Sequence, residues 1–181
     1  MKIIKRIVFA IGALVLLALV VALFVPKAMK AEREIVIAKP KEQVFDYIKY
    51  LKNQDNYSKW ALMDPDMKKE YRGTDGTVGF VSAWESEKDD VGKGEQEIKA
   101  IEEGKRIDFE LRFVKPFEST AQAYMLTDAV DSSHTKVSWG FSGNMAWPIN
   151  IFRLFMDPEK AIGDDFAAGL SKLKAILEQQ Q

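Results

Sequence analysis

The sequence contains no cysteine, which excludes disulfides, thiolate metal sites, iron–sulfur clusters and cysteine nucleophiles. It has one histidine, His134, so neither a multi-histidine metal site nor a Ser-His-Asp system can be assembled. His134 follows Asp131 and two serines, a composition typical of an exposed turn. Glycine-rich phosphate-binding motifs are absent as well. We therefore predict no catalytic residue, no metal ligand and no cofactor.

Acidic residues are missing from the N-terminal region and outnumber basic residues in the rest of the chain. Residues 1–30 hold five of the 26 lysines and arginines and no acidic residue, whereas residues 31–181 hold 21 basic and 27 acidic residues. The larger part of the chain is therefore acidic, with a net charge near −6. Because such a surface repels phosphate backbones, we expect no nucleic-acid partner. The acidic cluster at 85–90 lacks the ligand spacing of a calcium loop and is interpreted as a solvated hairpin.

Polar side chains are missing altogether from residues 7–25. As a helix, these nineteen residues would span about 28 Å, close to the roughly 30 Å of a bilayer's hydrocarbon core. Basic residues flank the run on both sides. The pattern predicts a transmembrane helix that contacts the membrane, with residues 1–30 as an anchor and residues 31–181 as one soluble domain.

A cleaved signal peptide is the alternative interpretation of this segment. Its apolar region would be about 7–15 residues long and would end at a small-x-small cleavage site. The observed run is longer, and Lys30 stands where such a site would need a small residue after Ala28. We therefore favour an uncleaved, single-pass anchor. Because a short basic N-terminus usually stays in the cytoplasm, we expect the domain to face away from it.

Period-two alternation dominates the middle of the chain. It is clearest over residues 106–113, where apolar and charged residues alternate and so indicate one buried and one solvated face. Asp108 and Glu110 are expected on the solvated face. Short turns between the strands favour an antiparallel meander. Seven strands are predicted, at residues 34–38, 68–72, 77–85, 92–101, 106–113, 119–127 and 135–141.

Helical spacing occurs at both ends of the soluble part. After Pro40, an apolar stripe continues to Leu51, and a second short helix is expected to carry Tyr57 and Trp60. The last helix has a clear start, with Asp157 as N-cap before a proline and a glutamate. Its buried stripe is predicted to consist of Ile162, Phe166, Gly169, Leu170, Leu173, Ile176 and Leu177.

Local patterns accompany this order of elements, at residues 37–45 opening the first helix, at Trp60, at 135–139 in the last strand and at 162–174 in the last helix. With them, residues 32–178 resemble the START-like, or SRPBCC, superfamily, which includes polyketide cyclase/dehydrase-like proteins. The resemblance implies an α+β helix-grip fold, in which a curved, seven-stranded antiparallel sheet wraps around the long C-terminal helix. The transmembrane helix is an addition to that domain.

The resemblance also implies a hydrophobic cavity between the sheet and the last helix. Inward-facing side chains and neighbours of the helix then become candidate ligand contacts. The candidates are Trp60, Phe80, Ser82, Trp84, Gln96, Phe113, Tyr124, Trp139, Phe141, Phe166, Gly169 and Leu170. For any single aromatic residue the alternative is that it only fills the core.

Three of these candidates have roles that the sequence leaves open. Gly169 lies on the buried helical stripe, where it either lets the helix approach the sheet or leaves volume for a ligand. Gln96 and Ser82 share faces with apolar residues and could supply the few polar groups that a ligand cavity needs. The alternative is that both bond to water or backbone at the wet end of the sheet.

Residues 145–156 are too apolar for an ordinary connection between a strand and a helix. They could cover the mouth of the cavity as a lid, contact the bilayer, or tuck under the sheet and complete the core.

The combined expectation is a membrane-tethered module that binds a hydrophobic small molecule or lipid. One alternative is a cyclase- or dehydratase-type enzyme, which would need a buried carboxylate or a tyrosine such as Tyr124 in the cavity. Another is a structural or partner-binding domain with a filled core. The identity of the ligand does not follow from the sequence.

Overall fold

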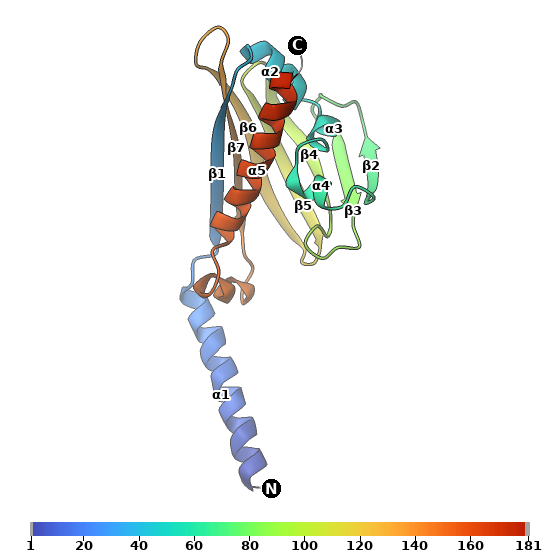
Figure 1. The fold of residues 1–181 in the computed structure, drawn as a ribbon. Helices are drawn as coiled ribbons and strands as arrows, with labels where there is room; N and C mark the ends of the chain where they lie inside the picture. Colours follow the sequence, from blue (N-terminus) through green and yellow to red (C-terminus); the bar gives the residue numbers. More distant parts are fainter. Residues whose placement is uncertain (1, 180–181) are drawn as a thin grey trace.

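Seven antiparallel strands form one curved sheet in the computed structural model, which describes residues 2–179 (Figure 1). Their order across the sheet is β1-β7-β6-β5-β4-β3-β2, so β2 to β7 form the predicted meander and β1 pairs with β7. The strands are β1 (Ala28–Ile37), β2 (Lys68–Arg72), β3 (Val81–Glu85), β4 (Lys93–Glu102), β5 (Arg106–Lys115), β6 (Ser119–Ala129) and β7 (Thr135–Asn144).

The first strand is longer than the sequence pattern predicted. β1 begins at Ala28 rather than near Glu34, and its first three residues fall within the range 1–30 expected for the anchor. Its hydrophobic alternation is weak, because an arginine, Arg33, occupies an inward position beside Trp139 of β7. The Arg33 guanidinium instead lies against Gly163 of the last helix.

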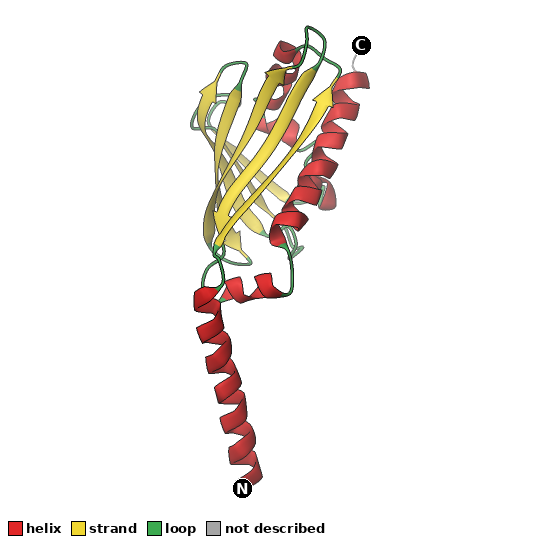
Figure 2. Ribbon diagram, turned by 90° about the vertical axis from the view of Figure 1, so that its left-hand side faces the viewer, coloured by secondary structure: helices red, strands yellow, loops and turns green. Residues whose placement is uncertain are grey.

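Helices cover only one face of the sheet, and the long C-terminal helix α5 runs along it (Figure 2). The predicted N-cap of α5 is confirmed, because the Asp157 carboxylate accepts a hydrogen bond of 2.9 Å from the backbone N–H of Lys160. The helices are α1 (Lys2–Phe24), α2 (Lys41–Ile48), α3 (Leu51–Gln54), α4 (Lys59–Met63), the 3₁₀ helix η1 (Ile149–Leu154) and α5 (Pro158–Gln179).

The helix expected to continue from Pro40 to Leu51 is broken in two. Tyr50 is extended, and α3 starts afresh where the Asp75 carboxylate accepts hydrogen bonds of 2.8 and 3.1 Å from the N–H groups of Leu51 and Lys52. Trp60 lies in α4 as expected, whereas Tyr57 lies in the turn before it. Because Asp75 lies 24 residues after Leu51, the helical spacing of residues 40–51 does not reveal this cap.

The core lies between α2, α5 and the inner face of the sheet. Trp139 of β7 stacks on Phe166 of α5 with ring centroids 4.6 Å apart, and Tyr57 meets Trp139 edge-on at 5.8 Å. At Gly169 a Cβ would lie 2.9 Å from the Trp139 ring and 3.2 Å from the Tyr57 carbonyl oxygen. Gly169 is therefore a point of close approach between α5 and the sheet. Of the two roles that the sequence left open for this glycine, the structure supports close packing rather than space for a ligand.

The outer face of the sheet is charged. Arg112 of β5 donates hydrogen bonds of 2.7 Å to Glu95 and Glu97 of β4 and also contacts Glu110. Asp108 bonds to Arg106 on the same face. The predicted outward orientation of Asp108 and Glu110 is thus confirmed, since both are engaged by arginines of their own strand on that face.

Helix α1 extends away from the sheet, and nearly all of its side chains are exposed (Figure 1). Among the described residues it is the one helix whose length and hydropathy would allow it to cross a membrane.

Candidate ligand cavity

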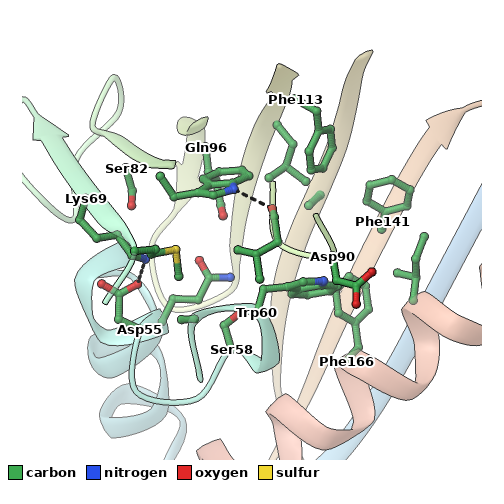
Figure 3. Close-up of a pocket in the computed structure, with 18 of the residues that line it drawn as sticks. Asp55, Ser58, Trp60, Lys69, Ser82, Asp90, Gln96, Phe113, Phe141 and Phe166 are labelled. Atoms are coloured by element: carbon green, nitrogen blue, oxygen red, sulfur yellow. Dashed lines mark hydrogen bonds and ion pairs between the residues drawn. The ribbon is translucent and has the colours of Figure 1, made fainter. Parts of the chain in front are cut away.

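A cavity of about 320 Å³ lies between the inner face of the sheet and helices α4 and α5 (Figure 3). This volume falls in the range of small-molecule sites. The strand register places it near the end of the sheet where β1 begins, because Trp84, Phe113 and Phe141 all lie toward the ends of their strands on that side. A filled core would not leave this space.

Aromatic rings form one side of the cavity. Trp60 of α4 meets Phe166 edge-on at 5.9 Å, and Trp84 of β3 meets Phe113 of β5 edge-on at 6.0 Å. Phe141 of β7 lines the same side of the cavity as Phe166 (Figure 3). These rings come from two helices, α4 and α5, and three strands, β3, β5 and β7, so the apolar wall depends on elements from across the fold.

Polar side chains gather on the opposite side, toward α3 and β2 (Figure 3). Gln96 and Ser82 are cross-strand neighbours in β4 and β3, and each is only 9% exposed. Within residues 2–179, neither side chain has a hydrogen-bond partner. Both side chains line the cavity and have no partner in the described part of the chain, so these two groups are suited to bind the polar part of a ligand.

An ionic group completes the polar side. The Asp55 carboxylate accepts hydrogen bonds of 2.6 Å from both Lys69 Nζ and the Tyr71 hydroxyl. Burial, followed by the hydrogen bond to Asp55, raises the pKa of Tyr71 above its ordinary value of 10.0. Asp55 and Lys69 both line the cavity and form an ion pair with each other. The charges on this part of the cavity wall therefore balance.

Two loops close the end of the cavity. The Trp84 indole N–H donates a hydrogen bond of 3.2 Å to the carbonyl oxygen of Val91 in the β3–β4 loop. Gly92 has a positive φ of 64°, and a Cβ there would lie 2.3 Å from the carbonyl oxygen of Lys115. Only glycine therefore lets this loop pack against the end of β5.

Eight of the twelve candidate residues line this cavity: Trp60, Ser82, Trp84, Gln96, Phe113, Trp139, Phe141 and Phe166. The other four do not. Phe80 is buried against Tyr71, stacked at 6.1 Å, while Leu170 and Gly169 lie in the packed core between helix and sheet.

Tyr124 is the clearest correction among these four. It pairs with Asp108 and Gly140 across the sheet, so its side chain lies on the outer face, away from the cavity. Its hydroxyl donates a hydrogen bond to Glu32 of β1, and the Arg106 guanidinium lies 4.4 Å from its ring centroid. Tyr124 is therefore not available as the cavity tyrosine that the enzymatic alternative named as an example.

The cavity residues that the sequence analysis missed come mostly from short helices and loops. They include Gln54, Asp55 and Ser58 around α3, Lys69 of β2, and Asp89 and Asp90 of the β3–β4 loop. The last two belong to the acidic cluster interpreted as a solvated hairpin; they are exposed, and they stand at the mouth. The sequence signal for the polar side of the cavity was the alternation in β3 and β4, which put Ser82 and Gln96 on the inner face of the sheet.

Residues 145–156 neither line the cavity nor join the core. They form η1 and its flanks, which pack against the C-terminal end of α1. Two of the three alternatives, the lid and the core segment, are therefore wrong, because the side chains of Trp147 and Asn150 tie this segment to α1 instead.

The fold is that of START-like proteins, with a helix gripped by a curved antiparallel sheet. The chain belongs to the family described as "Polyketide cyclase / dehydrase and lipid transport", whose model matches residues 28–178. No curated relative matches the chain at a significant level.

Solved structures share the fold at low sequence identity. Truncated norcoclaurine synthase from Thalictrum flavum is 8% identical with a TM-score of 0.64, covering 87% of this chain and 98% of its own. A Thermobifida fusca protein is 19% identical with a TM-score of 0.57, covering 84% and 95%. Protein CV1439 from Chromobacterium violaceum is 13% identical with a TM-score of 0.58, covering 83% and 98%.

Proposed function

We propose that this chain is a membrane-tethered binding module whose cavity holds a hydrophobic small molecule or lipid that carries a polar group. The observation that carries the proposal is the division of the cavity wall, with aromatic rings on one side and the side chains of Gln96 and Ser82, which have no partner among the described residues, on the other. A ligand with an apolar body and a polar end would satisfy both sides at once. The family description, which includes lipid transport, supports this ligand class.

The tether in this proposal is α1. Its side chains are exposed and apolar over a length that matches the hydrocarbon core of a bilayer. The basic residues before the helix favour a cytoplasmic N-terminus, which would place the cavity domain on the other side of the membrane. A topology reporter fused after residue 181 tests this orientation: activity on the cytoplasmic side would contradict it.

Native mass spectrometry of the full chain, released from detergent, tests binding in the cavity. Ala61 of α4 lines the cavity and is partly exposed, so Ala61→Phe would fill the space without burying a new side chain in the core. Ala168→Phe, on the exposed face of α5, is the matched control. We expect a bound small molecule in the wild type and in Ala168→Phe, and its loss in Ala61→Phe.

This comparison separates cavity ligands from lipids bound around α1, because the latter would persist in all three proteins. Identical spectra for the three proteins would contradict the proposed function.

A further inference from the structure

Residues 145–156 expose a cluster of large apolar side chains next to the end of α1. Trp147 is 44% exposed, Phe152 51%, Leu154 56%, Met156 55% and Phe155 82%. In a water-soluble domain such a patch would be unfavourable. Its position beside the apolar α1 indicates what covers it.

The segment is fixed to α1 by hydrogen bonds to carbonyl groups near the end of that helix. The side-chain amide of Asn150 donates to the carbonyl oxygens of Ala22, at 2.7 Å, and Val25, at 2.9 Å. Carbonyl groups in the last turn of a helix lack partners within the helix. Asn150 is fully buried, so it acts as a cap that locks η1 to α1.

The Trp147 indole N–H adds a hydrogen bond of 3.3 Å to the carbonyl oxygen of Leu19. Leu19 lies five residues before Phe24, the last residue of α1, which corresponds to about 7.5 Å along the helix axis. Ile151 and Phe152 of η1 line an apolar pocket together with Val15 and Ala18 of α1. The segment therefore lies beside the last turns of α1 rather than beyond them.

Its orientation fits a membrane surface. η1 runs crosswise to α1, between that helix and the sheet (Figure 2). If α1 crosses a bilayer, η1 lies in the membrane plane, at the 5–10 Å depth where interfacial helices bury their apolar face. Tryptophan is enriched at this level of membrane proteins.

Basic groups lie on the domain side of the patch. Lys27, just before β1, and Lys30, the third residue of β1, are both exposed. Arg153 of η1 donates a hydrogen bond of 2.6 Å to the carbonyl oxygen of Ala28 and lies 3.5 Å from Glu159. Exposed apolar side chains and exposed lysines thus occur together at the end of α1, the combination that an interfacial segment needs.

We propose that residues 145–156 are a second membrane contact, which lies in the lipid interface and holds the domain upright on the bilayer. In this proposal the interfacial layer of a phospholipid bilayer covers the exposed apolar side chains of residues 145–156. The inference rests on the tether in the proposed function and goes beyond it, because a simple tether would leave the domain free to rotate.

The contact also directs the mouth of the cavity. The antiparallel register puts the ends of β3, β5 and β7, and the start of β1, at one end of the sheet. The β3–β4 loop, which carries Asp90, and the β5–β6 loop, which follows Lys115, therefore face the same way as η1. Phe117, 61% exposed, lies in one of these loops. A ligand could then enter the cavity from the lipid surface.

The chain's lack of cysteine makes a clean test possible, because one introduced cysteine can be labelled alone. Full chain carrying Phe155→Cys would be labelled with an environment-sensitive fluorophore and reconstituted into phosphatidylcholine vesicles that contain nitroxide lipids. Met156→Cys provides a second position in the patch. Leu16→Cys reports on α1, and Val130→Cys, an exposed apolar position at the opposite end of the sheet, is the matched control.

We expect headgroup-level nitroxides to quench the labels at 155 and 156, nitroxides deep in the acyl chains to quench the label at 16, and neither to quench the label at 130. If positions 155 and 156 behave like 130 while 16 is quenched, the second contact is overturned and the tether stands. If position 16 is also unquenched, the tether itself fails and the second contact with it.

Discussion

The amide nitrogen of Asn150 lies 2.7 Å from the carbonyl oxygen of Ala22, so a residue of η1 closes a helix that ends more than a hundred residues earlier. This contact, with its partner at Val25, joins the apolar helix to the folded domain. The connection between the two parts is therefore a defined junction rather than a free linker.

Removal of that junction should loosen the chain between α1 and β1. Asn150→Ala leaves two carbonyl groups without their donor, which costs about 1–3 kcal/mol for buried groups. Because 1.4 kcal/mol corresponds to a factor of ten, we expect tryptic cleavage after Lys27 to accelerate by roughly tenfold in reconstituted full chain.

The control for this experiment is Asn144→Ala, an exposed asparagine at the end of β7. It should be cleaved at the wild-type rate. Equal cleavage of Asn150→Ala and Asn144→Ala would show that the amide does not hold the junction.

Gln96 should contribute more to ligand binding than to stability. Its amide lines the cavity and has no partner among the described residues, so Gln96→Met, similar in size, removes a polar ligand contact without breaking a hydrogen bond within the protein. We expect the bound small molecule to be lost, while the free energy of unfolding of ligand-free protein stays within about 1 kcal/mol of the wild type. Thermal unfolding and native mass spectrometry measure the two effects.

Gln122→Met is the matched substitution on the exposed outer face of β6. It should change neither quantity measurably. A Gln96→Met protein that retains its ligand in full would contradict the role assigned to this amide.

The order of elements and the inner face of the sheet could be predicted because both follow from local patterns. Alternation over 106–113 fixed the buried face of β5, and the same reasoning put Gln96 and Ser82 on the cavity side. The N-cap at Asp157 was equally local. Each of these depends only on residues a few positions apart.

The polar half of the cavity could not be predicted in this way. Asp55 and Ser58 lie in turns around α3, where side-chain direction is set by packing against β2 and not by a repeating period. Tyr124 was misplaced although β6 alternates, with Ala123 and Met125 buried on either side of it. Strict use of that alternation would have put the tyrosine outside.

Tyr124 and Glu32 form a pair on the outer face that should be visible in alkaline titration. The hydrogen bond to the Glu32 carboxylate, followed by burial, raises the pKa of Tyr124 from 10.0 to about 12. The neutral phenol is thus favoured in the folded state, and this contribution to stability is complete below pH 10 and is lost between about pH 10 and 12.

Glu32→Gln removes the carboxylate, so the pKa of Tyr124 should fall toward its ordinary value. The ultraviolet absorbance of tyrosinate measures this as one tyrosine titrating earlier. Glu34→Gln, on the same strand but paired with Lys136, should leave the titration unchanged. If Glu32→Gln and Glu34→Gln titrate alike, Glu32 is not the cause of the shift.

The two glycines of α5 should respond to alanine in opposite directions. At Gly169 a Cβ would meet the Trp139 ring at 2.9 Å and the Tyr57 carbonyl oxygen at 3.2 Å, groups that cannot move without disturbing the core. At Gly163 the nearest atoms, at 2.3–2.7 Å, all belong to the end of the flexible Arg33 side chain. Alanine adds about 1 kcal/mol of helix propensity at either position.

Gly169→Ala should therefore lower the free energy of unfolding by about 1–3 kcal/mol through overpacking, despite the gain in propensity. Gly163→Ala should leave it unchanged or raise it by up to about 1 kcal/mol, because Arg33 can swing aside. Thermal unfolding of the full chain, followed by tryptophan fluorescence, compares the two. A stabilising Gly169→Ala would mean that helix and sheet are not in close contact there, and that the volume beside Trp139 is available to a ligand after all.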